Sequence, residues 1–460
     1  MAEVKRDGTA LWGRGAGLPP PVGAAAPSSE WFRRLEGQLE QTERRYRERR
    51  RVREGVVHQL QDEGRTPLDV DTPERVRARL TRLGIESADG TLCPDIARAR
   101  SSITAEPVSL VYERVLGHSD LTSVCFLERG LQVSRTVGRV RIRDSRGRPM
   151  GYGTGFLVSP RLLLTNNHVL RSATEAGNSQ IEFNYQSGVD GASLPSVLFA
   201  LDPGTFFVTN ARLDYTLVAV KPRSLEGQEL RDFGFNRLIE AQGKVLLGEY
   251  VNIIQHPNGE PKQLALRENQ VVDLLEDFCH YQTDTAPGSS GSPVYNDQWE
   301  VVALHHMGVP KRSEDGRLLT ASGETWEQGM DPALLAWKAN EGVRVSSLVR
   351  HLRARSLSGE AARLRAEVLE AVGSSEKASR PRTGSRRRPA QISARRSTQN
   401  DRESSSVETA GRGSREPVAL VVDSTVVTWE PEPSPGQVAL TEGGATLTLP
   451  LRLNIQLRLG

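Results

Sequence analysis

The chain has 460 residues, of which 37% are hydrophobic and 25% are charged, and its formal net charge is +3 at pH 7. This length predicts two or three domains, and the low apolar fraction predicts that part of the chain lies outside any packed core. The small net charge excludes a basic nucleic-acid footprint that extends over the whole protein.

Residues 1–28 are rich in Gly, Pro and Ala, a composition that predicts a disordered N-terminus. The stretch has no continuous apolar region of the kind found in signal peptides, and no run in the chain is long enough to span a bilayer. The three cysteines, Cys93, Cys125 and Cys279, cannot all pair within the chain, so we expect no disulfide framework and a reducing compartment. These features predict a cytoplasmic protein without a membrane partner.

Residues 29–125 carry apolar side chains near helical spacing among many charged residues, which predicts a helical N-terminal region. From Val137 the pattern changes to short β-prone runs separated by turn signals. These runs predict a mainly β barrel or sandwich within residues 126–350. Helical patterns return at residues 331–340 (DPALLAWKAN) and continue in a helical extension at residues 351–372.

The C-terminal part of the chain has two different compositions. Residues 373–416 are rich in Ser, Arg, Gly and Pro and nearly lack apolar side chains, which predicts a disordered linker. Residues 417–460 alternate apolar and polar side chains, which predicts a short β-rich segment that docks on the main body or on a partner. The arginine clusters at 44–53 and 386–396 could contact nucleic acid, but glutamates accompany the first and aromatic residues are scarce. We therefore do not expect a nucleic-acid partner.

A serine in the stretch TDTAPGSSGSPVYN, residues 283–296, is the first candidate for chemistry. Gly288 lets the chain turn without a steric cost from Cβ just before Ser290. The backbone amides of Gly288 and Ser290 could then point at one oxygen, as an oxyanion hole requires. A serine hydroxyl is a weak nucleophile until a base takes its proton, so the chain must also supply a base.

His168 and Asp214 are the candidates for that base and for the acid that orients it. His168 follows an apolar run in a polar TNN turn, and Asp214 directly precedes the apolar run YTLVAV. Taken singly, His168 could be a core histidine and Asp214 a turn residue. Together with Ser290 they occur in the order His-Asp-Ser within a β-rich region, which is the order of the triad in chymotrypsin.

Three motifs make residues from about 135 to 350 resemble the trypsin-like (chymotrypsin-fold) serine peptidases: GTGFLVSPRLLLTNNHV, DYTLVAV and PGSSGSPV. The likeness is greatest to bacterial, disulfide-free members related to staphylococcal glutamyl endopeptidase, and to a group of uncharacterised bacterial trypsin-like proteins. This resemblance implies a chymotrypsin-like double β-barrel and a peptidase that needs no cofactor. It implies that His168 is the general base, that Asp214 fixes its tautomer and that Ser290 is the nucleophile. Ser289 stands where trypsins have an aspartate that pairs with a new N-terminus, which implies activation without that ion pair.

The resemblance gives conflicting indications about specificity. Asp284 lies where trypsins have the carboxylate that selects Arg or Lys, and His305 lies where glutamyl endopeptidases have a histidine that helps bind an acidic side chain. An Asp284–His305 ion pair would leave neither available, and plain strand packing is the alternative for His305 and His306. We favour cleavage after a basic residue, because one carboxylate is sufficient for it. We expect His306, Met307 and Gly308 to form the strand edge that pairs with the substrate backbone.

These features predict a serine endopeptidase that acts on a protein or peptide substrate. Metal-ligand spacings such as CxxC and HExxH are lacking, so we expect no metal. The segments that flank the protease region predict a regulatory protein partner or a means of gating the site. The alternative is an interaction or scaffold protein whose protease fold is catalytically inactive.

Overall fold

The computed structural model describes residues 29–85, 122–266, 269–282, 288–327, 330 and 334–370, and five strands between residues 419 and 456. The chain divides into two units, Met1–Arg382 and Thr383–Gly460. The stretches 1–28 and 373–416, predicted to be disordered, lie outside the described residues. The second unit contains a three-stranded sheet, β15 (Ala419–Val422), β16 (Thr425–Pro431) and β19 (Leu451–Gln456), and a hairpin of β17 (Gln437–Thr441) and β18 (Gly444–Thr448).

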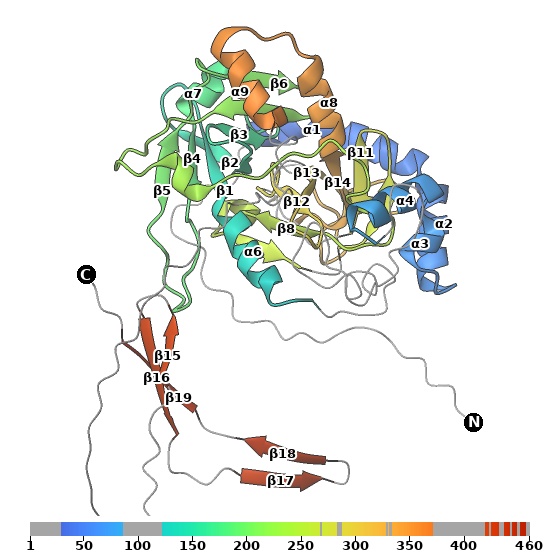
Figure 1. Cartoon of the computed structure of the whole chain (residues 1–460). Coiled ribbons are helices and arrows are strands. Elements are labelled where there is room, and N and C mark those ends of the chain that lie inside the picture. Colours follow the sequence, from blue (N-terminus) through green and yellow to red (C-terminus); the bar gives the residue numbers. More distant parts are fainter. Residues whose placement is uncertain are drawn as a thin grey trace, which may run out of the picture. The chain divides into compact units, whose positions relative to one another are not determined.

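The first unit is mainly β and contains two antiparallel sheets, as the sequence predicts (Figure 1). The first sheet has the strand order β5-β4-β1-β2-β3-β7-β6, and a bridge between Leu201 and Val220 closes it into a barrel. Its strands are β1 (Val137–Arg143), β2 (Pro149–Leu157), β3 (Leu162–Thr165), β4 (Gln180–Phe183), β5 (Val197–Ala200), β6 (Phe207–Asn210) and β7 (Tyr215–Ala219).

The second sheet has the order β10-β11-β14-β13-β12-β8-β9, and a bridge between Tyr250 and Gln270 closes it in the same way. The fold is therefore a double β-barrel of the chymotrypsin type. The strands of the second barrel are β8 (Asn252–Gln255), β9 (Gln263–Ala265), β10 (Val271–Leu274), β11 (Phe278–Tyr281), β12 (Pro293–Tyr295), β13 (Val301–Pro310) and β14 (Trp337–Arg344).

The strand β14 corrects one prediction. The apolar residues of DPALLAWKAN suggested a helix at residues 331–340, but the chain from Trp337 onward is an extended strand that pairs with both β11 and β13. Pairing on both sides satisfies the backbone hydrogen bonds of the strand and outweighs the local helical preference of Ala and Leu. Residues 331–333 lie outside the described residues.

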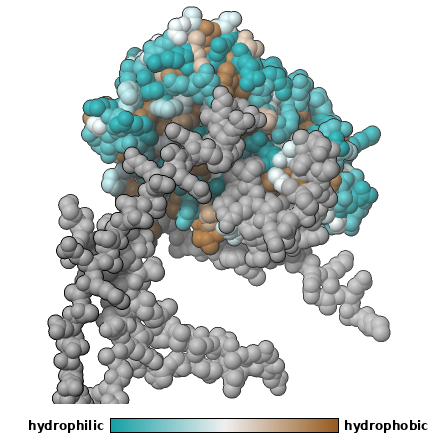
Figure 2. All heavy atoms as spheres, viewed as in Figure 1, coloured by the Kyte–Doolittle hydropathy of each residue, from teal (hydrophilic) through white to brown (hydrophobic). Residues whose placement is uncertain are grey.

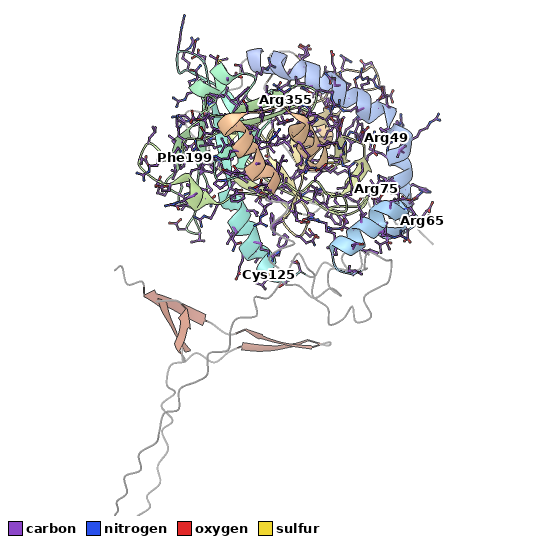
Figure 3. The ribbon with its side chains drawn as sticks, turned by 45° about the horizontal axis from the view of Figure 1, so that its top comes forward. Arg49, Arg65, Arg75, Cys125, Phe199 and Arg355 are labelled. Atoms are coloured by element: carbon purple, nitrogen blue, oxygen red, sulfur yellow. The ribbon has the colours of Figure 1, made fainter. Side chains whose placement is uncertain are left out.

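Helices flank the two barrels. The N-terminal layer consists of α1 (Ser29–Glu48), α2 (Arg50–Gln61), α3 (Pro67–Val70) and α4 (Pro73–Arg82). The helix α6 (Cys125–Arg135) leads into the first barrel, and α7 (Ala173–Asn178) lies between β3 and β4. At the end of the unit, α8 (Val345–Ala354) and α9 (Gly359–Glu370) follow β14. Figure 3 shows Arg49 and Arg75 on the helical layer and Phe199 in the first barrel.

Sequence patterns explain how these helices begin and pack. The Thr72 side chain accepts a hydrogen bond from the Arg75 amide, and Pro73 follows it in the first turn, so α4 has a capped start. Buried side chains of α8 recur at a helical spacing, Val345, Leu348, Val349 and Leu352, and join a core that includes residues of both barrels. The visible outer surface that is not drawn in grey is mostly hydrophilic (Figure 2).

Candidate active site

His168 and Asp214 lie together because the strands beside them are paired. The strand β3 is antiparallel to β7, and Thr165 at the end of β3 is opposite Thr216 near the start of β7. The residues that follow β3 therefore meet those that precede β7. His168 Nδ1 donates to Asp214 Oδ2 at 2.6 Å, and the His168 backbone amide donates to Oδ1 at 3.0 Å. His168 thus binds both oxygens of the Asp214 carboxylate.

The Asp214 carboxylate is fully buried, and its backbone has a φ of 44°, in the left-handed region that few non-glycine residues adopt. Burial alone would oppose ionisation, but the charges and hydrogen bonds of His168 and His306 hold the pKa of Asp214 well below its usual range. The carboxylate is therefore an acceptor at every physiological pH. It holds the proton of His168 on Nδ1 and leaves Nε2 as the atom suited to proton exchange.

The loop that carries Ser290 is anchored to the first barrel at Thr154, on β2. The Thr154 amide donates to the Ser290 carbonyl at 2.8 Å, and Thr154 Oγ1 donates to the Gly288 carbonyl at 2.9 Å. Gly288 and Gly291 have φ values of 97° and 91°. A Cβ on Gly291 would lie 1.9 Å from the Thr154 carbonyl oxygen, so only glycine fits there. The two glycines thus let the loop turn tightly against β2.

His306 joins the serine to the histidine–aspartate pair. Ser290 Oγ donates to the His306 carbonyl oxygen at 3.4 Å, and His306 Nδ1 lies 3.1 Å from Asp214 Oδ2. One residue of β13 thus contacts two of the three predicted triad members, and the third, His168, shares the same aspartate oxygen. Ser290 is partly exposed, while His168, Asp214 and His306 are buried. The structure therefore brings the predicted triad residues to one place, at the junction of the two barrels.

The residues predicted to bind substrate are only partly described. Asp284 lies outside the described residues. His305 is buried, and its Nδ1 lies 2.8 Å from the Tyr281 hydroxyl oxygen. Burial lowers the pKa of His305 to about 3, with smaller contributions from the nearby His306 and His168, so its ring is neutral at neutral pH. An ion pair between His305 and an acidic substrate side chain is therefore disfavoured.

The strand edge predicted to bind the substrate backbone lies on β13. Met307 and Gly308 pair with Glu341 and Asn340 of β14 on one side. On the other side, β12 pairs with β13 only between Val301 and Leu304. The backbone of His305 is also bonded on this side, to Ser292 and Gly291. Among the described strands, this edge of β13 beyond His305 has no partner strand, which suits pairing with an extended peptide.

Three polar residues of this region were not predicted from the sequence: Thr154, His280 and Glu341. The signal for Thr154 was present, since it lies within the GTGF motif. His280 and Glu341 lie on neighbouring strands, at paired positions of β11 and β14, and each is fully buried. Buried charged residues in strands are uncommon unless they are paired, but single-sequence patterns do not show which partner is present.

Two other predictions concern metal ligands and membrane-spanning segments in the described ranges. Within them, no group of three or more His, Cys, Asp or Glu side chains is arranged to hold a metal ion. None of the helices described combines the length and the apolar character needed to cross a membrane.

Comparison with known proteins bears on the fold of this region. Residues 153–304 match the family model of the trypsin-like peptidase domain. The match supports a serine protease fold, and its range contains His168, Asp214 and Ser290.

The proteins that are similar to part of the chain include the following two. An uncharacterized protein, y4fB, of Sinorhizobium fredii is 41% identical over 268 residues, which cover 53% of this chain and 40% of that protein. The secreted RxLR effector protein 73 of Plasmopara viticola is 34% identical over 195 residues, or 38% of this chain and 46% of that protein. The chain thus spans less than half the length of both relatives.

Proposed function

We propose that this protein is a serine endopeptidase that hydrolyses peptide bonds through His168, Asp214 and Ser290. The observation that carries the proposal is the placement of these residues. His168 donates a hydrogen bond to the buried, ionised Asp214 carboxylate. The Ser290 hydroxyl donates to the backbone carbonyl of His306, and the ring of His306 contacts the same carboxylate. The match to the trypsin-like peptidase domain supports the same reaction class.

In the proposed mechanism Ser290 Oγ attacks the carbonyl carbon of the scissile peptide bond, and His168 Nε2 accepts the hydroxyl proton. The Asp214 carboxylate stabilises the imidazolium that forms and keeps the ring in the required tautomer. The amides of Gly288 and Ser290 are proposed to bind the oxyanion, and each such donor contributes about 3–4 kcal/mol of transition-state stabilisation. His168 then protonates the leaving amine, and water hydrolyses the acyl-enzyme by the reverse sequence of proton transfers.

The proposed substrate is an extended protein segment with Arg or Lys at the cleaved position. The sequence position of Asp284 supports this choice, because a carboxylate at the base of the pocket would pair with a basic side chain. The structure weakens the case for an acidic side chain, because His305 is neutral and already faces the Tyr281 hydroxyl.

The test is cleavage of a library of unstructured peptides of varied sequence by the wild-type chain and by Ser290→Ala. Cleavage products that appear with the wild type and are absent with Ser290→Ala would support the proposal. A folded wild-type chain that cleaves no peptide would overturn it and favour an inactive protease fold that binds partners.

A further inference from the structure

A chain of buried polar side chains extends from the candidate active site through the second barrel. His306 Nε2 lies 2.8 Å from Glu341 Oε1, while its Nδ1 faces Asp214. His280 Nε2 lies 2.9 Å from the other Glu341 oxygen, Oε2. The side chains of Asp214, His280, His306 and Glu341 have essentially no exposed surface. A connected series of buried polar side chains therefore extends from Asp214, just before β7, through His306 of β13 to Glu341 of β14 and His280 of β11.

The N-terminal helix α1 completes this series from outside the barrel. Thr42 Oγ1 donates to Glu341 Oε1 at 2.9 Å, and Arg45 Nε donates to Oε2 at 3.0 Å. The Arg45 guanidinium also lies 3.9 Å from the centre of the Phe278 ring. Glu341 is thus contacted by His280 of β11, by His306 of β13 and by Arg45 of α1. Arg45 lies 296 positions earlier in the sequence.

The contacts of the His306 ring point to a protonated, positively charged side chain. An ionised carboxylate can only accept hydrogen bonds, and each ring nitrogen of His306 faces one carboxylate. Both nitrogens must therefore donate, as they do in an imidazolium. Burial by itself would lower the pKa of His306, but the hydrogen bonds and charges of Asp214 and Glu341 raise it above the ordinary value.

The charges alternate in sign along the series: Asp214, His306, Glu341 and Arg45. Removing one member of a buried ion pair leaves the charge of the other uncompensated. The resulting loss of folding stability is much larger than for an exposed pair. Without Arg45 and Thr42, Glu341 would lose the donors that α1 supplies. It would then be free to attract water or to move, and His306 and Asp214 would move with it.

We propose that His306 is a positioning residue that holds the Asp214 carboxylate for His168, and that the helix α1, through Thr42 and Arg45, locks His306 by fixing Glu341. This inference rests on the proposed peptidase function. Its consequence is that residues of the N-terminal helical layer are part of the working active site. Release of α1 from β14 would lower activity while the serine, histidine and aspartate remain in the chain.

The first test measures the charge of His306 directly and needs no activity. The chain with Ser290→Ala is labelled with ¹⁵N-histidine, and the His306 signals are assigned by their loss in Ser290→Ala/His306→Gln. We expect both ring nitrogens of His306 to be protonated at pH 7 and at pH 8. A neutral tautomer, with one unprotonated nitrogen at pH 7, would overturn the proposal.

The second test follows the rate at which a fluorophosphonate modifies Ser290 as a function of pH. The charged and titratable groups around His306 in the described residues are Asp214, His168, Glu341, His280, His305 and Arg45. In His306→Gln a positive charge beside Asp214 is lost, so the general base is easier to protonate. The acidic limb of the rate profile should move to higher pH by about one unit. A slower reaction with an unmoved limb would show a packing role only and contradict the proposal.

The third test concerns α1. Arg45→Met and Thr42→Val should each reduce the modification rate, by about tenfold or more for Arg45→Met, because a displaced carboxylate misaligns the base. Arg44→Met is the control on the same helix, since Arg44 is exposed. Arg312→Met is the control for helix docking. It breaks the ion pair between Arg312 and Glu43 of α1, and that ion pair does not involve Glu341. Both controls should react at the wild-type rate.

The outcomes separate this inference from the proposed function. If the wild type is modified at Ser290 and Arg45→Met and Thr42→Val react as fast as the wild type, the inference is wrong and the peptidase proposal stands. If Arg312→Met slows the reaction as much as Arg45→Met, helix docking in general is responsible and the route through Glu341 is wrong. If the folded wild type is not modified, the peptidase proposal fails, and the charge of His306 still decides whether the buried series exists as described.

Discussion

Thr154 and Gly288 join the first barrel to the loop that carries Ser290. Thr154 Oγ1 donates to the Gly288 carbonyl at 2.9 Å and accepts from the His256 amide at 3.1 Å. The Thr154 hydroxyl therefore gives a hydrogen-bond partner both to the His256 amide of the second barrel and to the Gly288 carbonyl of the serine loop. It also sets the position of the glycine whose amide is proposed for the oxyanion hole.

Replacing Thr154 by valine tests this link, because valine keeps the shape and removes the hydroxyl. The buried His256 amide and Gly288 carbonyl would lose a partner, which should lower the free energy of unfolding by about 1–3 kcal/mol. The rate of peptide cleavage should fall as well, because Gly288 is less firmly placed. Urea unfolding and cleavage rates measure the two effects. Thr174→Val, at an exposed position, should change neither.

Gly291 should tolerate no side chain. An added Cβ would lie 1.9 Å from the Thr154 carbonyl oxygen, and the backbone has a φ of 91°. The matched control is Gly316→Ala, which has a similar φ of 84° but no atom within 4 Å of the added Cβ. Gly316→Ala should cost only the left-handed backbone strain, about 1–2 kcal/mol. Gly291→Ala should cost clearly more and abolish cleavage, and equal thermal stability of the two variants would argue against the loop conformation.

Asp214→Asn should reduce kcat by a factor of about 10⁴ if the aspartate sets the histidine tautomer as proposed. The asparagine amide cannot accept from both His168 and His306 in the way the ionised carboxylate does. The control is Asp202→Asn, which removes an aspartate paired with Lys221 at the surface of the same barrel. A kcat for Asp214→Asn within tenfold of that control would contradict the assigned role.

The stability of the fold should depend on pH through two buried neutral histidines. Burial lowers the pKa of both His256 and His305 to about 3. In the unfolded chain each takes up a proton near its ordinary pKa of about 6.5, while in the folded chain it does not. Their contribution to stability is therefore complete above pH 6.5 and is lost as the pH falls toward 3.

The expected loss between pH 6.5 and pH 5 is about 2 kcal/mol for each of the two histidines, since one pH unit corresponds to about 1.4 kcal/mol. His306 acts in the opposite direction, because its pKa is raised in the folded chain: the stability that it contributes is complete below about pH 6.5 and falls as the pH rises above that value. Urea midpoints measured from pH 5 to pH 7 should show this slope. His256→Gln should reduce the slope by about half, and the exposed His58→Gln should not; equal slopes in all variants would contradict the account.

Asp284→Asn tests the proposed specificity. If the carboxylate selects basic side chains, the variant should lose most of the preference for Arg and Lys at the cleaved position while still reacting at Ser290 with small phosphonates. A cleavage profile against a peptide library measures this. An unchanged preference for basic residues, or a wild-type preference for Glu, would assign specificity to another group.

The sequence allowed the strands and the neighbourhood of His168 and Asp214 to be predicted, because each residue adjoins a strongly apolar run that becomes β3 or β7. It did not allow β14 to be predicted, since Ala and Leu upstream have a helical preference and only pairing with β11 and β13 makes the segment a strand. The contacts between α1 and Glu341 were also beyond prediction, because they join residues 296 positions apart. The specificity of the pocket and the relation to glutamyl endopeptidases remain predictions.

The most direct measurement is the site at which a fluorophosphonate probe attaches to the folded wild-type chain. A serine activated by His168 and Asp214 should form a stable phosphonyl adduct, and peptide mass spectrometry should place that adduct on Ser290. The adduct should be absent from Ser290→Ala and nearly absent from His168→Ala. A folded wild-type chain without an adduct at Ser290, or with equal modification after His168→Ala, would contradict the central claim that these residues form a working triad.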